Sequence, residues 1–190
     1  MLVSSTMLDL GTKASDFTLS DPDDNKWSLS ECMGENGFLV AFICNHCPFV
    51  IHLKEALNIY AMDYKQKGIN VVAINSNDMD AYPADNLEAM KVDSEEHNYI
   101  FPYLADMDQS IAKAYKAICT PDFYLFDNNA KLVYRGQFDR SRPNQGEATG
   151  DTIRQATDQL LAGEDPLTTQ LPSMGCNIKW IQGQEPDYFG

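Results

Sequence analysis

The sequence of 190 residues predicts a single α/β domain with a mixed central sheet, helices on both of its faces, an N-terminal β-hairpin extension and a C-terminal tail. Two continuous apolar segments, residues 38–43 and 69–74, are typical of strands covered on both faces, and a helical pattern separates them. Residues 122–126 and 131–135 are strand-like and joined by a tight turn, which predicts an antiparallel hairpin. A β-α-β unit followed by such a hairpin predicts both parallel and antiparallel pairing.

The N-terminal part predicts the small hairpin. Residues 17–20 and 26–29 alternate between apolar and polar side chains, and they flank a turn at 21–25 that is rich in Asp, Pro and Asn. Ser28 and Glu31 then match a capping box, which predicts a short helical turn directly after the hairpin.

Two helices are predicted around the second central strand. The first runs from about Cys47 to Lys67 and ends at Gly68, and the second starts at Pro83, which suits a first helical turn, and reaches Glu96. The apolar and aromatic residues of the first helix recur at helical spacing: Leu53, Ala56, Leu57, Tyr60 and Tyr64.

The later elements are shorter. A strand at 101–104 precedes a short helix at 108–115, for which Asp108 is the expected cap. A closing helix is expected between a Thr149 cap and Gly163. Residues 164–190 contain no predicted helix, and we expect this C-terminal extension, with Cys176 and Trp180, to pack on the single domain formed by residues 1–190.

The composition of the sequence argues against some classes of binding partner. Asp and Glu number 28 against 14 Lys and Arg, a formal net charge of −14, which argues against nucleic acid and anionic membranes as partners. No apolar stretch approaches the roughly 20 residues that span a membrane, and the first residues lack the basic region of a signal peptide. We therefore expect a cytoplasmic protein, in which five cysteines favour catalytic or buried thiols over structural disulfides.

The most informative motif is Cys44-Asn45-His46-Cys47-Pro48, placed between an apolar strand and a helix. Unpaired backbone N–H groups and the dipole of a helix N-terminus stabilise a thiolate, which is the reactive form of cysteine. Haem attachment is excluded, because it needs His directly after the second Cys. A structural zinc site usually takes four ligands, and the other three cysteines are single and widely spaced. A redox pair is the leading interpretation, with a zinc site or two inert buried cysteines as alternatives.

The order of elements, with Cys-x-x-Cys after the first central strand and Cys119-Thr120-Pro121-Asp122 before the late hairpin, resembles the thioredoxin fold. The resemblance implies a cis bond before Pro121, with this proline facing the active cysteines. It also implies that the backbone of Thr120 is free to pair with a bound thiol partner. We therefore expect Pro48, Thr120 and Pro121 beside Cys44 and Cys47.

The chain as a whole is similar to the redoxin branch of that superfamily, the alkyl hydroperoxide reductase and thiol-specific antioxidant family. Within it, the chain resembles a bacterial peroxiredoxin-like group with a Cys-x-x-Cys-Pro motif. The similarity implies a thiol-disulfide oxidoreductase with an antioxidant role. The segments that carry the similarity are residues 14–19, 42–49, 73–78, 119–123, 134–137 and 175–180.

The sequence also departs from that family. Peroxiredoxins have Thr-x-x-Cys-Pro at the active loop, and here Cys44 replaces the Thr while Cys47-Pro48 is kept. They also carry an Arg that stabilises the thiolate where this chain has Thr120-Pro121, and Arg135, one strand later, is a candidate substitute. By pattern, the disulfide-exchange site is complete and the peroxidase pocket is incomplete.

Three functions follow from the motif. In the leading one, Cys44, expected to be the more exposed thiol, attacks a disulfide and Cys47 resolves the mixed disulfide. In a thiol peroxidase, peroxide oxidises Cys47 and Cys44 resolves it. The third is a metal- or redox-sensing binding module. The expected partners are a thioredoxin- or glutathione-like reductant and a peroxide or protein disulfide substrate, and neither a cofactor nor a metal ion is expected for the leading function.

Other residues are candidates for supporting roles. His46 could stabilise a thiolate as an imidazolium, and packing or a loop hydrogen bond is the alternative. Cys119 and Cys176 are candidate accessory thiols, with an inert buried role as the alternative for Cys119 and a resolving role considered for Cys176. Cys32 has no motif around it and is expected to be inert.

Overall fold

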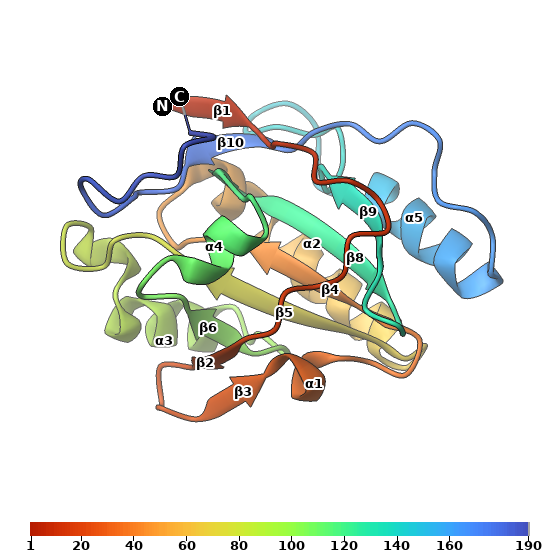
Figure 1. Cartoon of the computed structure of the whole chain (residues 1–190), viewed down its shortest axis with the longest axis horizontal. Helices are drawn as coiled ribbons and strands as arrows, with labels where there is room; N and C mark the ends of the chain where they lie inside the picture. Colours follow the sequence, from red (N-terminus) through yellow and green to blue (C-terminus); the bar gives the residue numbers. More distant parts are fainter. Residues whose placement is uncertain (190) are drawn as a thin grey trace.

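The computed structural model describes residues 1–189, which form a large sheet, a small sheet and helices packed around them (Figure 1). Across the large sheet the strands are β3 (Lys26–Ser28), β2 (Thr18–Ser20), β6 (Tyr103–Ala105), β5 (Ile69–Asn75), β4 (Gly37–Phe42), β8 (Asp122–Asp127) and β9 (Leu132–Gly136). Strands β4, β5 and β6 run parallel, whereas β8 and β9 and the β2–β3 hairpin pair antiparallel. The predicted mixed sheet with a hairpin at its edge is confirmed.

Helices cover both faces of this sheet, as predicted. Alternation along β4 creates the two layers: Leu39 and Ala41 pack with residues of α2, α3 and α5, whereas Phe38 and Val40 pack with residues of α1 and α4. Figure 1 shows α4 in front of the sheet and α2 behind it. Burial of each large apolar side chain stabilises the fold by roughly 1.5–3 kcal/mol. The helices are α1 (Leu29–Cys32), α2 (Pro48–Lys65), the 3₁₀ turn η1 (Pro83–Asp85), α3 (Leu87–Glu96), α4 (Ser110–Ala114) and α5 (Asp151–Ala162).

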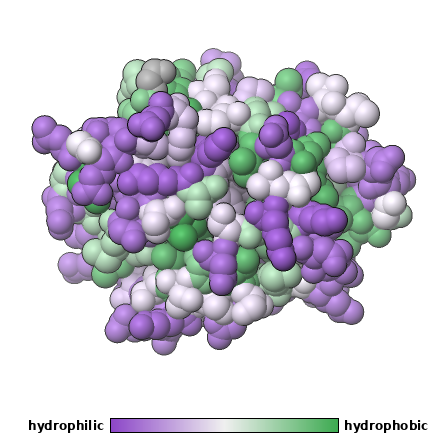
Figure 2. Space-filling model, in the orientation of Figure 1, coloured by the Kyte–Doolittle hydropathy of each residue, from purple (hydrophilic) through white to green (hydrophobic). Residues whose placement is uncertain are grey.

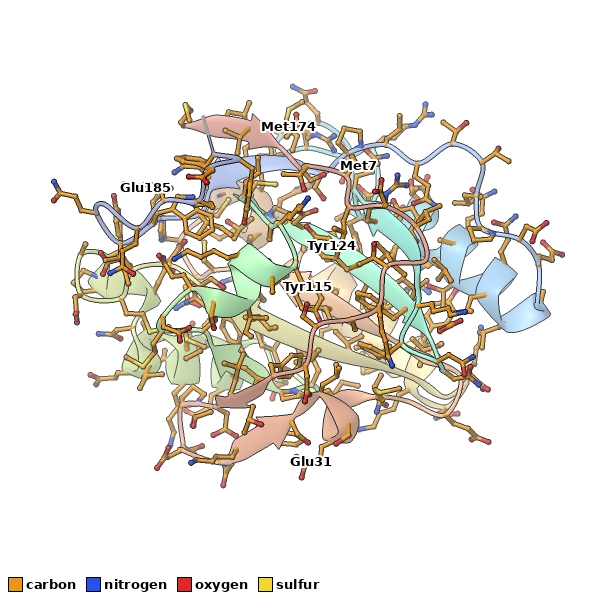
Figure 3. The ribbon with its side chains drawn as sticks, in the orientation of Figure 1. Met7, Glu31, Tyr115, Tyr124, Met174 and Glu185 are labelled. Carbon is orange, nitrogen blue, oxygen red and sulfur yellow. The ribbon has the colours of Figure 1, made fainter. Side chains whose placement is uncertain are left out.

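An aromatic cluster anchors the end of β4 from which the cysteine motif departs. Tyr115, at the end of α4, and Tyr124, on β8, lie together in front of the sheet (Figure 3), with ring centroids 5.7 Å apart and ring planes at 83°. Phe42, the last residue of β4, contacts both rings at centroid distances of 5.6 and 5.8 Å. Edge-to-face packing of this kind adds about 0.5–1.5 kcal/mol per pair to the burial of the rings.

The small sheet joins three distant parts of the chain. It consists of β1 (Leu2–Ser4), β10 (Met174–Asn177) and β7 (Cys119–Thr120), with β10 in the middle and antiparallel to both neighbours. The sequence predicts neither β1 nor β10, because strands this short have no readable alternation. Gly175 allows the close approach, since a Cβ there would lie 2.0 Å from the Thr120 carbonyl oxygen.

Three helix starts differ from the prediction. The helix expected from Pro83 is broken into η1 and α3, because the Asn86 side chain caps α3 by accepting the Ala89 N–H. The short helix α4 starts at Ser110 rather than Asp108, after Gln109 in a left-handed conformation. Gly150, not Thr149, precedes α5, and the two N–H groups of Thr149 and Gly150 donate to the buried carboxylate of Asp139.

The surface of the described residues is largely hydrophilic on the face seen in Figure 2, where hydrophobic residues form small scattered groups. Within residues 1–189, none of the helices combines the length and the apolar character that crossing a membrane requires.

Candidate active site

The two cysteines of the motif lie in the loop that connects β4 to α2. Cys47 is the N-cap of α2, and Pro48 occupies the first helical turn, where its missing N–H costs no hydrogen bond. Both thiols are buried, with 1% of Cys44 and none of Cys47 exposed. The helix N-terminus therefore points its partial positive charge at a dithiol that is shielded from solvent.

Thr120 and Pro121 lie against this pair. The Thr120–Pro121 bond is cis, as the resemblance implied. The Thr120 hydroxyl is 3.4 Å from Cys44 Sγ, and the Thr120 carbonyl oxygen is 3.2 Å from Cys47 Sγ. The structure therefore brings together the residues that the sequence predicted to surround the pair.

The surroundings of the pair favour a proton on Cys44 over one on Cys47. A hydrogen bond from Cys44 lowers the pKa of Cys47 to about 5, and the N–H groups of Cys176 and Val50 act in the same direction against the cost of burial. The pKa of Cys44 is raised well above its usual range by that hydrogen bond, by burial and by the negative charge of Asp85. The Thr120 carbonyl oxygen favours a protonated Cys47, but the donors around this sulfur and the helix terminus outweigh one acceptor.

The expectation that Cys44 is the more exposed of the two thiols is therefore wrong. The two side chains are equally shielded, and the thiolate is stabilised on Cys47 instead. The reason is positional, because Cys47 caps α2 while Cys44 lies in the preceding loop near a buried carboxylate. Spacing alone cannot reveal which of two cysteines meets the helix terminus.

We expect the Cys47 thiol to titrate near pH 5 rather than near 9.0. Thiolate ultraviolet absorbance of the reduced protein measures this, and the low-pH step should vanish in Cys47→Ser. Because the folded pKa lies below the unfolded one, the thiolate adds stability that is fully present above pH 9.0 and is lost as the pH falls through about 5. A first thiol titrating only above pH 8 would contradict this assignment of the proton.

The loop between the cysteines is held by buried polar groups. The Asn45 backbone N–H donates to the Asp85 carboxylate at 2.9 Å, and the Asn45 side chain bonds the Ala84 carbonyl and the Tyr103 hydroxyl. Lys54, only 4% exposed, donates to the Asn45 carbonyl oxygen and forms an ion pair with Asp93. Removing one partner of such a buried pair typically costs about 3–5 kcal/mol, so the loop is rigidly positioned.

The sequence did not point to this network. Asp85 is fully buried, and it also accepts from the Asn77 side chain at 2.7 Å. Nothing in the local pattern of a turn marks a carboxylate that will be buried. The burial of Lys54 could have been predicted from the sequence. It lies on the same face of the helix as Val50, Leu57 and Ala61, and a charged residue on a buried face must find a partner.

His46 is half-exposed and pairs with Asp85 rather than with a thiol. Its Nδ1 lies 2.7 Å from Asp85 Oδ2. Ligand atoms of Cys44, His46 and Asp85 lie within 4.8 Å of one another, a combination that metal ions use. Two ligands of a tetrahedral zinc ion lie roughly 3.3 Å apart, since each bond is about 2.0–2.1 Å long. The short His46–Asp85 contact must therefore open before an ion can enter.

The other candidate residues are placed differently. Cys119 is fully buried and its thiol faces the Pro121 carbonyl oxygen at 3.7 Å, while Cys32 is buried in the layer with α1 and α4. The Arg135 guanidinium donates to the Leu8 carbonyl and to the Gln170 side chain. The structure thus directs Arg135 to these partners instead of the thiols.

The backbone of Thr120 is not free, which corrects another expectation. β10 pairs with β7 along this edge, and Cys176 stands directly opposite Thr120. The tail of the chain therefore occupies the place where a partner's backbone was expected.

Comparison with known proteins fits this geometry. The model of the AhpC/TSA family matches residues 10–135. The chain belongs to the AhpC/TSA family. This match spans the N-terminal hairpin, the cysteine motif and the cis proline, and it confirms the redoxin branch that the sequence resembled. The C-terminal extension with β10 lies outside the matched residues.

Individual similar proteins add detail. Thiol-disulfide oxidoreductase ResA from Bacillus thuringiensis subsp. konkukian is 25% identical over 126 residues, which are 66% of this chain and 68% of that protein. A hypothetical protein from Sinorhizobium meliloti 1021 is 50% identical, with a TM-score of 0.92 over 95% of this chain and 99% of that one. A Chlorobium tepidum structure assigned as a thiol:disulfide interchange protein DsbE is 23% identical, with a TM-score of 0.64 over 81% and 99%. The thioredoxin-like fold and the prediction of an oxidoreductase are confirmed.

Proposed function

We propose that the protein is a thiol-disulfide oxidoreductase that cycles Cys44 and Cys47 between a dithiol and a disulfide, with Cys47 as the nucleophile. The observation that carries this proposal is the pairing of a thiolate-stabilised Cys47 at the start of α2 with a protonated Cys44 beside it. The relative named ResA supports the same reaction class.

The geometry suits a two-step exchange. The Cys47 thiolate attacks one sulfur of a substrate disulfide, so that a Cys47–substrate bond forms and the other substrate sulfur leaves as a thiolate. Cys44 then gives up its proton to a departing thiolate and attacks Cys47 Sγ, which releases the second substrate thiol. Two electrons pass to the substrate, and a Cys44–Cys47 disulfide remains.

Thiol counting tests this cycle. We expect mild oxidation with diamide to remove two thiols together from the wild-type protein, and peptide mapping to place both in one Cys44–Cys47 disulfide. Dithiothreitol should restore both. Cys32→Ala, which removes a thiol remote from the pair, should behave like wild type. If the pair loses no thiols while the fold is intact, the proposal is wrong.

A thiol peroxidase is the second candidate, and one observation favours it. Cys47 directly precedes Pro48, and its pKa is lowered to about 5, which favours the thiolate form that attacks peroxide. Against it, Cys44 stands where peroxidases have Thr, and Arg135 is engaged elsewhere.

The rates at which the reduced protein reacts with peroxide and with disulfides separate the two candidate functions. We expect the reduced protein to react with peroxide more slowly than with disulfides, because losing a preorganised donor typically costs about a hundred- to a thousandfold. Stopped-flow oxidation by hydrogen peroxide and by oxidised glutathione gives the comparison. A faster reaction with peroxide would favour the peroxidase and an antioxidant role.

Three further expectations from the sequence stay predictions. They are the metal- or redox-sensing hypothesis, a cytoplasmic location, and a thioredoxin- or glutathione-like reductant.

A further inference from the structure

The C-terminal extension places a third cysteine next to the active pair. In the β7–β10 ladder Cys176 stands opposite Thr120, so the two side chains share one face of the small sheet. Directly opposed residues of antiparallel strands have Cβ atoms about 4.5–5.5 Å apart. The Thr120 hydroxyl on that face is 3.4 Å from Cys44 Sγ, and the Cys176 thiol is close enough to Cys47 to influence its ionisation.

The three thiols differ in their access to solvent. Cys44 and Cys47 are buried, and so are Cys32 and Cys119. Within residues 1–189, Cys176 is the cysteine that is only partly buried. A thiol reagent arriving from solvent therefore meets Cys176 before it can reach the pair.

Strand β10 also restricts direct access to the pair. It fills the free edge of β7 beside the cis proline, and Gly175 packs on the Thr120 carbonyl group so closely that no side chain fits between them. On its other edge β10 is paired with β1, which holds it in place. Any external thiol or disulfide that reacts directly with Cys47, the substrate of the proposed cycle included, therefore needs local opening of this strand.

We propose that Cys176 is a third redox thiol through which an external thiol reductant regenerates the buried pair. The proposal rests on the proposed cycle of Cys44 and Cys47, and it adds the route by which electrons enter. The reductant is of the low-molecular-weight thiol class, for which reduced glutathione is the probe.

In each step of this route one disulfide bond forms and another breaks. The Cys176 thiolate attacks Cys47 Sγ of the Cys44–Cys47 disulfide; the Cys47–Cys176 bond forms, the Cys44–Cys47 bond breaks, and Cys44 takes up a proton. A reductant thiolate then attacks the accessible Cys176 Sγ and expels Cys47 as a thiolate. A second reductant thiolate attacks the reductant sulfur bound to Cys176, which releases Cys176. Two reductant thiols become one disulfide, and the pair returns to its dithiol form.

The pKa values of the two thiols favour the second step, in which the reductant thiolate attacks Cys176 Sγ and Cys47 leaves. The pKa of Cys47 is lowered to about 5, and that of Cys176 is raised to about 11, first by burial and then by its hydrogen bond to Cys47. In thiol-disulfide exchange the sulfur with the lower pKa leaves faster. Attack on Cys176 therefore expels the better leaving group.

A trapping experiment tests whether the Cys47–Cys176 bond forms. Trypsin should leave Cys32, Cys44 and Cys47 in one peptide, residues 27–54, and Cys176 in residues 155–179. We expect the double variant Cys32→Ala/Cys44→Ser, treated with diamide, to yield these two peptides joined by a disulfide. Cys32→Ala/Cys44→Ser/Cys176→Ser should not yield the joined pair. If the double variant keeps both thiols free while folded, the proposal is overturned.

A kinetic experiment tests the route itself. Oxidised wild-type protein and oxidised Cys176→Ser are reduced with glutathione, and the freed thiols are counted over time. We expect Cys176→Ser to be reduced at least about tenfold more slowly, because attack on a buried sulfur needs local opening of the strand. Met174→Ser, an exposed position on the same strand, controls for disturbance of β10 (Figure 3).

The outcomes separate this inference from the proposed function. If Cys176→Ser still forms the Cys44–Cys47 disulfide but is reduced as fast as wild type, the relay is wrong and the proposed function stands. If neither protein forms that disulfide, the proposed function itself fails. Cys176→Ala, read in the same assay, must agree with Cys176→Ser for the relay to stand.

Discussion

Substitution of Cys47 by serine is expected to abolish reaction with both disulfides and peroxides. Cys47 is the thiol of the site whose pKa is lowered, whereas the pKa values of Cys44 and Cys176 are raised, so neither of these sulfurs is expected to replace it at neutral pH. Loss of a catalytic nucleophile reduces turnover by a factor on the order of a thousand or more. Glutathione disulfide consumption by the reduced protein measures the effect, and mass spectrometry detects any covalent intermediate.

Cys44→Ser supplies the contrast to this variant. With Cys47 intact, it should still attack a disulfide once, and the mixed disulfide on Cys47 should then accumulate unless Cys176 resolves it. Cys119→Ser is the matched control, because Cys119 is as deeply buried as the pair and lies on β7, next to Thr120. If Cys44→Ser rather than Cys47→Ser were inactive toward the first disulfide, Cys44 would be the nucleophile after all.

Substitution of Gly175 by alanine is expected to detach β10 from β7. The added Cβ would lie 2.0 Å from the Thr120 carbonyl oxygen and 2.7 Å from its carbon, and backbone atoms cannot move aside cheaply. Overpacking of this kind typically costs about 1–3 kcal/mol, so thermal unfolding should occur at lower temperature. The pair should also become more accessible, which the reaction rate with Ellman's reagent measures.

Gly183→Ala is the control for this variant. Gly183 also lies in the C-terminal extension, but no atom is found within 4 Å of its added Cβ, and only its positive φ of 80° opposes a side chain. We expect it to leave the reactivity of the thiols unchanged. Equal thiol reactivity in Gly175→Ala and wild type would show that β10 does not shield the pair.

The large sheet could be predicted from sequence because its signals are local. The continuous apolar run of β4 and the helical stripe of α2 each follow from residues that are neighbours in the chain. The position of the cysteine pair at the start of α2 could be predicted in the same way, because the motif lies between the apolar strand segment and the helical pattern. The cis proline was different, because Thr120-Pro121 has meaning only through the resemblance to a known fold.

What could not be predicted depends on contacts between distant segments. β10 is a strand only because β7 and β1 lie on either side of it, and a four-residue segment with a glycine shows no pattern by itself. Likewise, Asp85 lies 40 residues beyond the Asn45 N–H group that it accepts. The difference in pKa between Cys44 and Cys47 depends on such groups, so it could be assessed only once the fold was known.

The small sheet also bears on how the molecule behaves in a crowded solution. A strand edge with unpaired N–H and carbonyl groups is a template on which another chain can add a strand and begin to aggregate. In this protein the edge of β7 beside the reactive thiols is covered by β10, and β10 in turn by β1, so the exposed edge is moved away from the active site to a strand of three residues. The same covering that shields the thiols thus leaves less strand edge beside them on which a second chain could pair.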